Sequence, residues 1–146
     1  MIDLTCHLTD SITLKHPLIL ASGISGNSDS LMTRAVLSGA SAVTTKGITV
    51  KYRKGAANPV STDWGYGLIT NLGLTNPGPV SMNYMINSFR KLLEPEKVPV
   101  FVNIYGETPE ECAEISAKML ESSPDLIEID LPVPEEKLAV EMTIAV

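Results

Sequence analysis

The chain alternates between strand-like runs and segments of helical period. Four such runs, at residues 17–21, 40–45, 98–102 and 125–131, are each followed by polar or glycine-bearing residues and then by a helical pattern. Continuous apolar runs are typical of strands buried on both faces, and strands that alternate with helices form parallel sheets with right-handed crossovers. The alternation therefore predicts an α/β fold.

Start and stop signals delimit the predicted helices. Ser28 or Asp29 can cap a helix over about 30–38, which Gly39 ends. Asn76-Pro77-Gly78-Pro79 precedes a helix over about 80–93. Its apolar residues recur at helical spacing and are Val80, Tyr84, Met85, Phe89, Leu92 and Leu93.

The third predicted helix has the clearest start. Thr108-Pro109-Glu110-Glu111 is a capping box with proline at the first helical position. We expect this helix to carry four apolar residues inward, namely Cys112, Ile115, Met119 and Leu120. A last helical segment has Leu138, Met142 and Ala145 on one side.

A parallel sheet of this kind is either open or closed into a barrel. Polar and glycine-bearing residues follow every strand, as at the upper rim of a (β/α)8 barrel, and a hairpin of segments 2–8 and 11–14 would close the bottom. We therefore predict an α/β fold of the (β/α)8 TIM-barrel type. Residues 1–146 form a single domain with about the first four β/α units plus the N-terminal hairpin.

Four parallel strands leave two sheet edges unpaired. In barrels of this type the phosphate-binding loops follow strands seven and eight, which we do not find here. The chain also ends at Thr143-Ile144-Ala145-Val146 without a C-cap signal. Two interpretations follow: a fragment completed by a missing C-terminal half, or a homodimer in which two copies form a pseudo-barrel. We favour the fragment.

Composition and charge exclude several classes of partner. The 146 residues, 44% of them hydrophobic, suffice for one core. No apolar run approaches the ~18 residues of a membrane span and no basic export signal precedes one, so we expect a cytoplasmic protein without a membrane partner. The net charge of −6 argues against nucleic acid. Cys6 and Cys112 are expected to be packing or surface thiols, and no metal site is predicted.

Lys46 is the strongest functional signal in the chain. It lies in Thr44-Thr45-Lys46-Gly47, just past a predicted buried strand, where a lysine needs an anionic partner. That partner is either a carboxylate such as Asp130 or a bound anionic group. Residues 48–70 then break the pattern, and long loops inside compact domains are usually functional.

Five strings stand at strand ends or in the long loop. They are Pro17-Leu18-Ile19-Leu20-Ala21-Ser22-Gly23, Thr44-Thr45-Lys46-Gly47-Ile48-Thr49, Asn58-Pro59, Gly73-Leu74-Thr75-Asn76-Pro77-Gly78 and Val98-Pro99-Val100-Phe101-Val102-Asn103. In order and spacing they resemble the N-terminal half of class 1 dihydroorotate dehydrogenases, over nearly the whole chain. The resemblance implies an FMN-containing barrel that oxidises dihydroorotate to orotate in pyrimidine biosynthesis.

The resemblance also implies a set of site residues. Those that would bind FMN are Ala21, Ser22, Lys46, Gly47, Asn103 and Asp130. Those that would bind the small-molecule substrate, dihydroorotate or a related compound, are Lys46, Thr70, Asn71, Leu72, Gly73 and Leu74. Reduction of a flavin places negative charge on its N1–C2 carbonyl edge, so a fixed ammonium there would stabilise the reduced state. For Asn103 the alternative is a loop residue that bonds its own backbone.

The sequence departs from the family after the fourth strand. The family typically reads Glu-Leu-Asn-Ile-Ser-Cys-Pro-Asn where this chain reads Glu128-Ile129-Asp130-Leu131-Pro132-Val133-Pro134-Glu135. Val133 replaces the cysteine that serves as general base, while Asp130 and Glu135 replace asparagines and would repel an anionic substrate. Thr70 likewise replaces an asparagine. The catalytic residue is therefore unassigned; Asp130 or Glu135 is a possible substitute base, and a solvated loop carboxylate is the alternative for Glu135.

Two functional interpretations remain. The first is an FMN-dependent oxidoreductase that resembles dihydroorotate dehydrogenase and has an altered base. The second is a non-catalytic flavin-binding or metabolite-binding relative that kept the scaffold. An unrelated phosphate-binding barrel enzyme is a third, disfavoured by the weak phosphate signals in this half.

Overall fold

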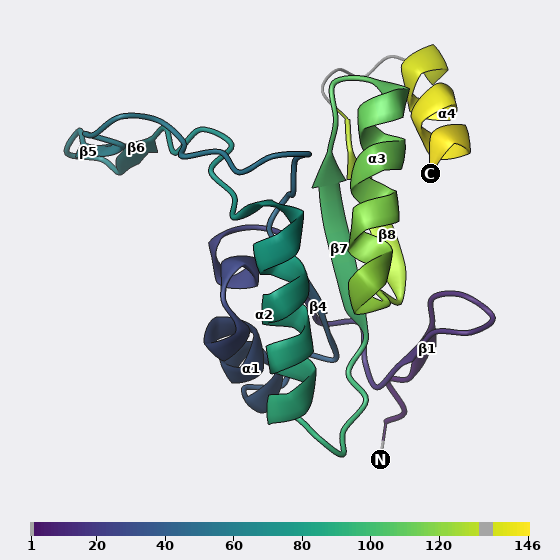
Figure 1. The fold of residues 1–146 in the computed structure, drawn as a ribbon. Coiled ribbons are helices and arrows are strands. Elements are labelled where there is room, and N and C mark those ends of the chain that lie inside the picture. The colour runs from purple at the N-terminus through teal and green to yellow at the C-terminus, as the bar shows by residue number, and fades with distance from the viewer. Residues whose placement is uncertain (1, 132–135) are drawn as a thin grey trace.

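A parallel sheet forms the centre of the molecule. The computed structural model describes residues 2–131 and 136–146. Its four-stranded sheet has the order β3 (Ile19–Leu20), β4 (Ala42–Thr44), β7 (Val100–Tyr105) and β8 (Leu126–Asp130). All neighbouring pairs are parallel, and the strands follow one another across the sheet in chain order. Figure 1 shows β4, β7 and β8 of this sheet. This arrangement fits part of a (β/α)8 barrel.

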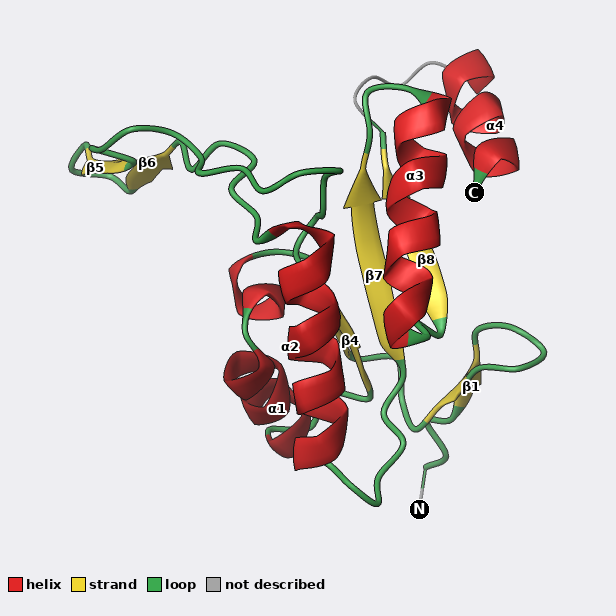
Figure 2. Ribbon diagram, viewed as in Figure 1, coloured by secondary structure: helices red, strands yellow, loops and turns green. Residues whose placement is uncertain are grey.

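The helices cover one face of this sheet (Figure 2). They are α1 (Asp29–Leu37), α2 (Gly78–Leu92), α3 (Pro109–Met119) and α4 (Glu136–Ala145), with short 3-10 turns at Ile24–Asn27 and Leu120–Ser122. The main core packs between helices and sheet, and its buried residues are Met32, Val43, Ile48, Met82, Ile86, Phe89, Leu93, Val100, Val102, Ile104, Cys112, Ile115, Met119 and Met142. In the part of the chain that the structure describes, no helix has the length and apolar character needed to cross a bilayer.

The other face of the sheet is covered only at its lower end. The predicted N-terminal hairpin is confirmed as β1 (Cys6–His7) paired antiparallel with β2 (Thr13–Leu14). Ile12 and Leu14 pack there against Ala42 and Phe101. The hairpin therefore closes the amino-terminal end of the inner sheet face, as the barrel interpretation requires.

The capping box of α3 is confirmed in part. The Thr108 hydroxyl accepts a hydrogen bond from the Glu111 backbone N–H at 3.3 Å, whereas the Glu111 carboxylate accepts one at 2.8 Å from the N–H of Glu107, the residue before the cap. The expected inward position of Leu120 is wrong, because α3 ends at Met119 and the following 3-10 turn leaves Leu120 exposed.

The helical spacing noted in α2 mixes two faces of the helix. Val80, Tyr84 and Leu92 are exposed. The face toward the sheet carries Met82, Ile86, Phe89 and Leu93, which are spaced four, three and four residues apart. Phe89 and Leu93 of the predicted set are therefore confirmed as buried, whereas Val80, Tyr84 and Leu92 lie on the outer side.

Two predicted strands change in extent. β7 runs through Tyr105, whereas we predicted a loop from Asn103, because the ladder to β8 continues as Asn103↔Glu128 and Tyr105↔Asp130. β3 is not buried on both faces: Ile19 and the preceding Leu18 are exposed, and β3 is the edge strand of the sheet.

The long excursion after β4 contains a hairpin that the sequence analysis did not predict. β5 (Ser61–Asp63) pairs antiparallel with β6 (Leu68–Thr70), and every residue from 61 to 70 is exposed. We call residues 54–74 the arm. Figure 1 shows the arm leaving the body near the carboxyl-terminal end of β7 and projecting away from the sheet.

Candidate functional site

The inner face of the sheet becomes polar toward its carboxyl-terminal edge. Side chains alternate between the two faces of a strand. Val43, Val102 and Ile104 point into the core under the helices. Thr44 and Asn103, which alternate with them, therefore lie on the inner face. In β8 the same alternation places Glu128 and Asp130 beside Asn103 and Tyr105. The carboxyl ends of parallel strands meet at one edge, which is where barrel enzymes hold their sites.

Lys46 follows β4 directly and its main chain is held firmly. Its backbone N–H donates to the Gly26 carbonyl at 3.0 Å. A side chain at Gly26 has no room, since a Cβ there would lie 2.5 Å from the Thr44 carbonyl oxygen and 2.6 Å from the Lys46 nitrogen. The loop before α1 thus packs directly on the backbone that carries Lys46.

Lys46 is half-buried and makes no ion pair with the residues that the structure describes. Across residues 2–131 and 136–146 the ion pairs are Lys15–Glu96, Arg53–Glu107, Arg90–Asp125, Lys118–Glu114 and Lys137–Glu141. The ion pair between Lys46 and Asp130, which was the structural alternative, is not among them. The described residues therefore leave a cation at the edge of the sheet without a carboxylate partner.

Asn103 is the most constrained polar residue of the edge. Its backbone N–H donates to the Thr45 hydroxyl at 3.1 Å, and its carbonyl accepts from the Ile48 N–H at 3.0 Å. Its side-chain nitrogen donates to the Glu128 carboxylate at 2.6 Å rather than to its own backbone. The amide oxygen is buried and has no partner in the described chain.

Gly47 covers that amide oxygen. A Cβ at Gly47 would lie 2.7 Å from Asn103 Oδ1, which is closer than side-chain packing allows. A side chain at this position would therefore displace the Asn103 amide, and glycine is favoured by this contact rather than by an unusual φ angle. Lys46 and Gly47 are held over β7 as one unit.

The remaining predicted cofactor residues also reach this edge. Ala21 and Ser22 follow β3 and are exposed, and Asp130 ends β8 and is exposed. The structure thus brings all six predicted cofactor residues to the carboxyl-terminal edge of one sheet. Val133 and Glu135 lie outside the described residues.

The predicted substrate segment lies elsewhere. Thr70 ends β6 on the arm, and the residues from 71 to 74 lead back toward α2. Figure 1 shows β6 projecting away from the sheet, apart from β4 and β7.

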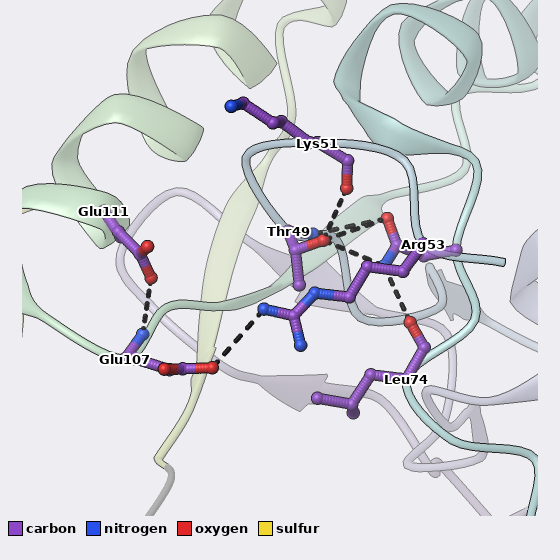
Figure 3. Close-up of polar contacts among 7 residues, drawn as sticks. Thr49, Lys51, Arg53, Leu74, Glu107 and Glu111 are labelled. Atoms are coloured by element: carbon purple, nitrogen blue, oxygen red, sulfur yellow. Dashed lines mark hydrogen bonds and ion pairs between the residues drawn. The ribbon is translucent and has the colours of Figure 1, made fainter. Parts of the chain in front are cut away.

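The base of the arm is clamped by a buried asparagine. Asn76 Nδ2 donates to the Thr49 hydroxyl at 3.0 Å and to the Leu74 carbonyl at 2.9 Å, and its Oδ1 accepts from the Gly78 N–H at 3.1 Å. The Thr49 hydroxyl in turn donates to the Lys51 carbonyl at 2.7 Å. Figure 3 shows these contacts around Thr49.

An ion pair joins this base to the loop before α3. Arg53 lies 3.4 Å from the Glu107 carboxylate (Figure 3). Its guanidinium also lies 5.9 Å from the centre of the Tyr105 ring. Both partners are substantially exposed, so the ion pair contributes about 1 kcal/mol or less. The buried Asn76 therefore holds the arm more strongly than the visible charges do.

Sequence reasoning missed three residues of the site. Glu128 anchors the Asn103 amide, Thr45 receives the Asn103 N–H, and Gly26 supports the Lys46 backbone. Alternation along β8 was the available signal for Glu128, because it puts residues 126, 128 and 130 on one face. Contact between Gly26 and β4 has no signal in a single sequence.

The fold and its polar edge define a partial (β/α)8 barrel with a binding edge at the carboxyl ends of its strands. The sequence pattern of dihydroorotate dehydrogenases matches residues 5–143. The chain belongs to this family.

Curated relatives and a solved structure agree with that assignment. The chain is 42% identical to the catalytic subunit of dihydroorotate dehydrogenase B (NAD(+)) of Pyrococcus abyssi over 126 residues, which are 86% of this chain and 40% of the relative. It is 35% identical over 126 residues to the same subunit of Methanothermobacter thermautotrophicus, covering 85% and 39%. The chain thus spans about 40% of the length of these relatives.

The solved structure supports the fold alone. A crystal structure of dihydroorotate dehydrogenase from Eimeria tenella, in complex with ferulenol, superposes with a TM-score of 0.72 at 17% sequence identity. The superposed region covers 98% of this chain and 42% of the Eimeria tenella chain. The predicted TIM-barrel class, with this chain as about its first four units, is confirmed.

Proposed function

We propose that this chain is part of an FMN-dependent oxidoreductase that oxidises dihydroorotate to orotate in pyrimidine biosynthesis. Family membership and the names of the curated relatives support the activity. The observation that carries the cofactor is Lys46, a half-buried cation without an ion pair among the described residues, at the edge where barrel enzymes bind their ligands.

The residues of this edge fit the ring system of a flavin. Gly47 exposes main chain for close approach, and Asn103 and Ser22 supply polar groups beside it. A bound flavin would supply the two-electron acceptor for the oxidation. Lys46 would fix a positive charge where negative charge develops, and Ala21, Ser22, Gly47, Asn103 and Asp130 would complete the contact with the ring.

The substrate would be held between this edge and the arm. Lys46 offers a charge complementary to a carboxylate, and residues 70–74 would contact the substrate from the arm. Because the arm is exposed and joined to the body through its base, we propose that it moves toward the edge when the substrate binds. The general base is unassigned, because Val133 stands where the family has cysteine.

One observation favours the second interpretation, a flavin- or metabolite-binding relative that no longer oxidises dihydroorotate. Asp130 ends β8 beside the proposed site and places a carboxylate where the family has a neutral asparagine. Dihydroorotate is itself an anion, and carboxylates placed next to it are repulsive. A substrate without that charge, or no turnover at all, is compatible with this surface.

We further propose that residues 1–146 form one domain that a C-terminal half completes, with a second copy of this chain as the alternative. The names of the curated relatives carry NAD(+) and the words "catalytic subunit". They support NAD(+) as the final electron acceptor and an electron-transferring partner subunit. A cytoplasmic location is part of the same proposal.

The test is spectroscopic. The purified natural protein should be yellow, release FMN on denaturation, and lose its flavin absorbance when dihydroorotate is added without oxygen. A flavin that binds but is never bleached by dihydroorotate would favour the second interpretation. A colourless protein that does not take up FMN would remove both flavin interpretations.

A further inference from the structure

The amide of Asn103 has one fixed orientation. An asparagine amide offers two N–H donors and one carbonyl acceptor, whereas an ionised carboxylate only accepts. The 2.6 Å contact between Asn103 Nδ2 and Glu128 Oε1 therefore requires the nitrogen to face Glu128. Asn103 and Glu128 are direct partners in the ladder of β7 and β8, so the strand register itself brings them together.

The carbonyl of this amide is closed to any ligand. Asn103 is 5% exposed, and its Oδ1 is buried beneath Gly47 without a hydrogen-bond partner in the described residues. One N–H is used by Glu128. The only hydrogen-bonding capacity left on the side chain is the second N–H.

We propose that Glu128 is a positioning residue that acts through Asn103 and makes it a hydrogen-bond donor, never an acceptor, toward the bound ligand. The ligand atom opposite Asn103 is then an acceptor, such as a carbonyl oxygen or an unprotonated ring nitrogen. This inference rests on the proposed flavin site for the identity of the ligand, but not for the orientation of the amide.

A matched asparagine–glutamate pair provides the control. Asn83 Nδ2 donates to the Glu121 carboxylate at 3.3 Å and to the Lys118 carbonyl at 2.8 Å, and Asn83 Oδ1 is likewise buried without a partner in the described chain. This pair joins α2 to the turn after α3 and lies outside the proposed site. Glu121→Met therefore removes a longer asparagine–glutamate contact away from the ligand, and Asn83 keeps its bond to Lys118.

The first experiment follows the side-chain amide itself. In the ¹⁵N-labelled natural protein, without added flavin, Glu128→Met should shift the Asn103 NH₂ resonances, whereas Glu128→Gln should keep them near their original position because its carbonyl still accepts. An Asn103 NH₂ signal that Glu128→Met leaves in place overturns the proposal, whether or not the protein binds flavin.

The second experiment measures FMN affinity by fluorescence titration. Glu128→Met should weaken binding about tenfold, as expected for loss of a hydrogen bond to a charged group, while Glu128→Gln and Glu121→Met stay within about threefold. Equal affinity of Glu128→Met and Glu121→Met would contradict a role at the site. If neither the natural protein nor any variant binds FMN, the proposed function fails. The NH₂ signal of Asn103 then decides by itself whether Glu128 positions the amide.

A double variant tests the polarity. In Asn103→Asp with Glu128→Gln, glutamine can donate to aspartate, so the contact between the strands persists with its direction reversed. Position 103 can then no longer donate to a ligand. We expect folded protein with FMN binding at least about tenfold weaker than Glu128→Gln alone. Equal binding by the two would show that Asn103 does not act as a donor.

Discussion

The sheet edge and the arm would supply the two sides of the proposed site, yet they are held in different ways. The edge is anchored by the core: Thr45 and Ile48 on either side of Lys46 are fully buried, and Lys46 itself is bonded to Gly26. The arm has an exposed hairpin and is attached through Asn76 at its base. Packing therefore determines where the cofactor residues lie, whereas little in this chain determines the final position of the substrate residues.

The largest expected difference is in the loss of stability when an isoleucine of the sheet or an isoleucine of the arm is replaced by alanine. Ile104 of β7 is fully buried, and Ile69 of β6 is 60% exposed. We expect Ile104→Ala to lower the free energy of unfolding by about 2–5 kcal/mol through lost burial and a cavity. Ile69→Ala should change it by about 0.5 kcal/mol or less. Urea unfolding followed by circular dichroism measures both, and comparable losses would mean that the arm packs as part of the core.

Two glycines make a finer test. Gly26→Ala places a Cβ against the backbone of Thr44 and Lys46, and we expect a loss of about 1–3 kcal/mol. Gly67→Ala, at the tip of the arm, meets nothing closer than Trp64 Nε1 at 3.6 Å and should be nearly neutral. Thermal unfolding compares them. A neutral Gly26→Ala would show that the loop before α1 does not brace Lys46.

The attachment of the arm is tested at its base. Asn76→Ala removes a buried amide with three hydrogen-bond partners, and about 1–3 kcal/mol of local stability should be lost. Amide hydrogen exchange between residues 49 and 78 should speed up while β7 stays protected. Asn71→Ala on the exposed arm is the control, and equal exchange in both variants would mean that the arm is held elsewhere.

Sequence periodicity located the edge and could not locate the arm. Runs of buried residues such as 40–45 reveal strands, and the residues just past them must lie at one edge of a parallel sheet, which is why Lys46 and Asp130 were placed correctly. The extent of β7 was underestimated, because Asn103 and Tyr105 look like loop residues until their pairing with Glu128 and Asp130 is known. The outer face of α2 also carries the apolar residues Val80, Tyr84 and Leu92, so periodicity did not separate Val80 from Met82.

The arm gave no such signal. Residues 61–70 have no buried face, and the hairpin is held by its own ladder rather than by a pattern of burial. Contacts between distant segments, such as Asn76 with Thr49 or Gly26 with β4, depend on the assembled fold. Local periodicity does not predict tertiary contacts of this kind.

The smallest expected effect is optical. Trp64 is the single tryptophan, lies at the arm and is 58% exposed, with its ring 5.3 Å from that of Tyr66. Its fluorescence should already resemble that of solvated indole in the native protein, so unfolding should shift the emission maximum only slightly. A strongly blue-shifted native emission would mean that the arm folds onto the body in the absence of ligand.

The central claim is that Lys46 is left unpaired for a flavin. The most direct measurement is FMN titration of the flavin-free natural protein against Lys46→Met, with Lys54→Met on the exposed arm as the matched control. We expect Lys46→Met to weaken FMN binding about tenfold to a hundredfold and Lys54→Met to leave it unchanged. Equal FMN affinity in Lys46→Met and the natural protein would contradict this account.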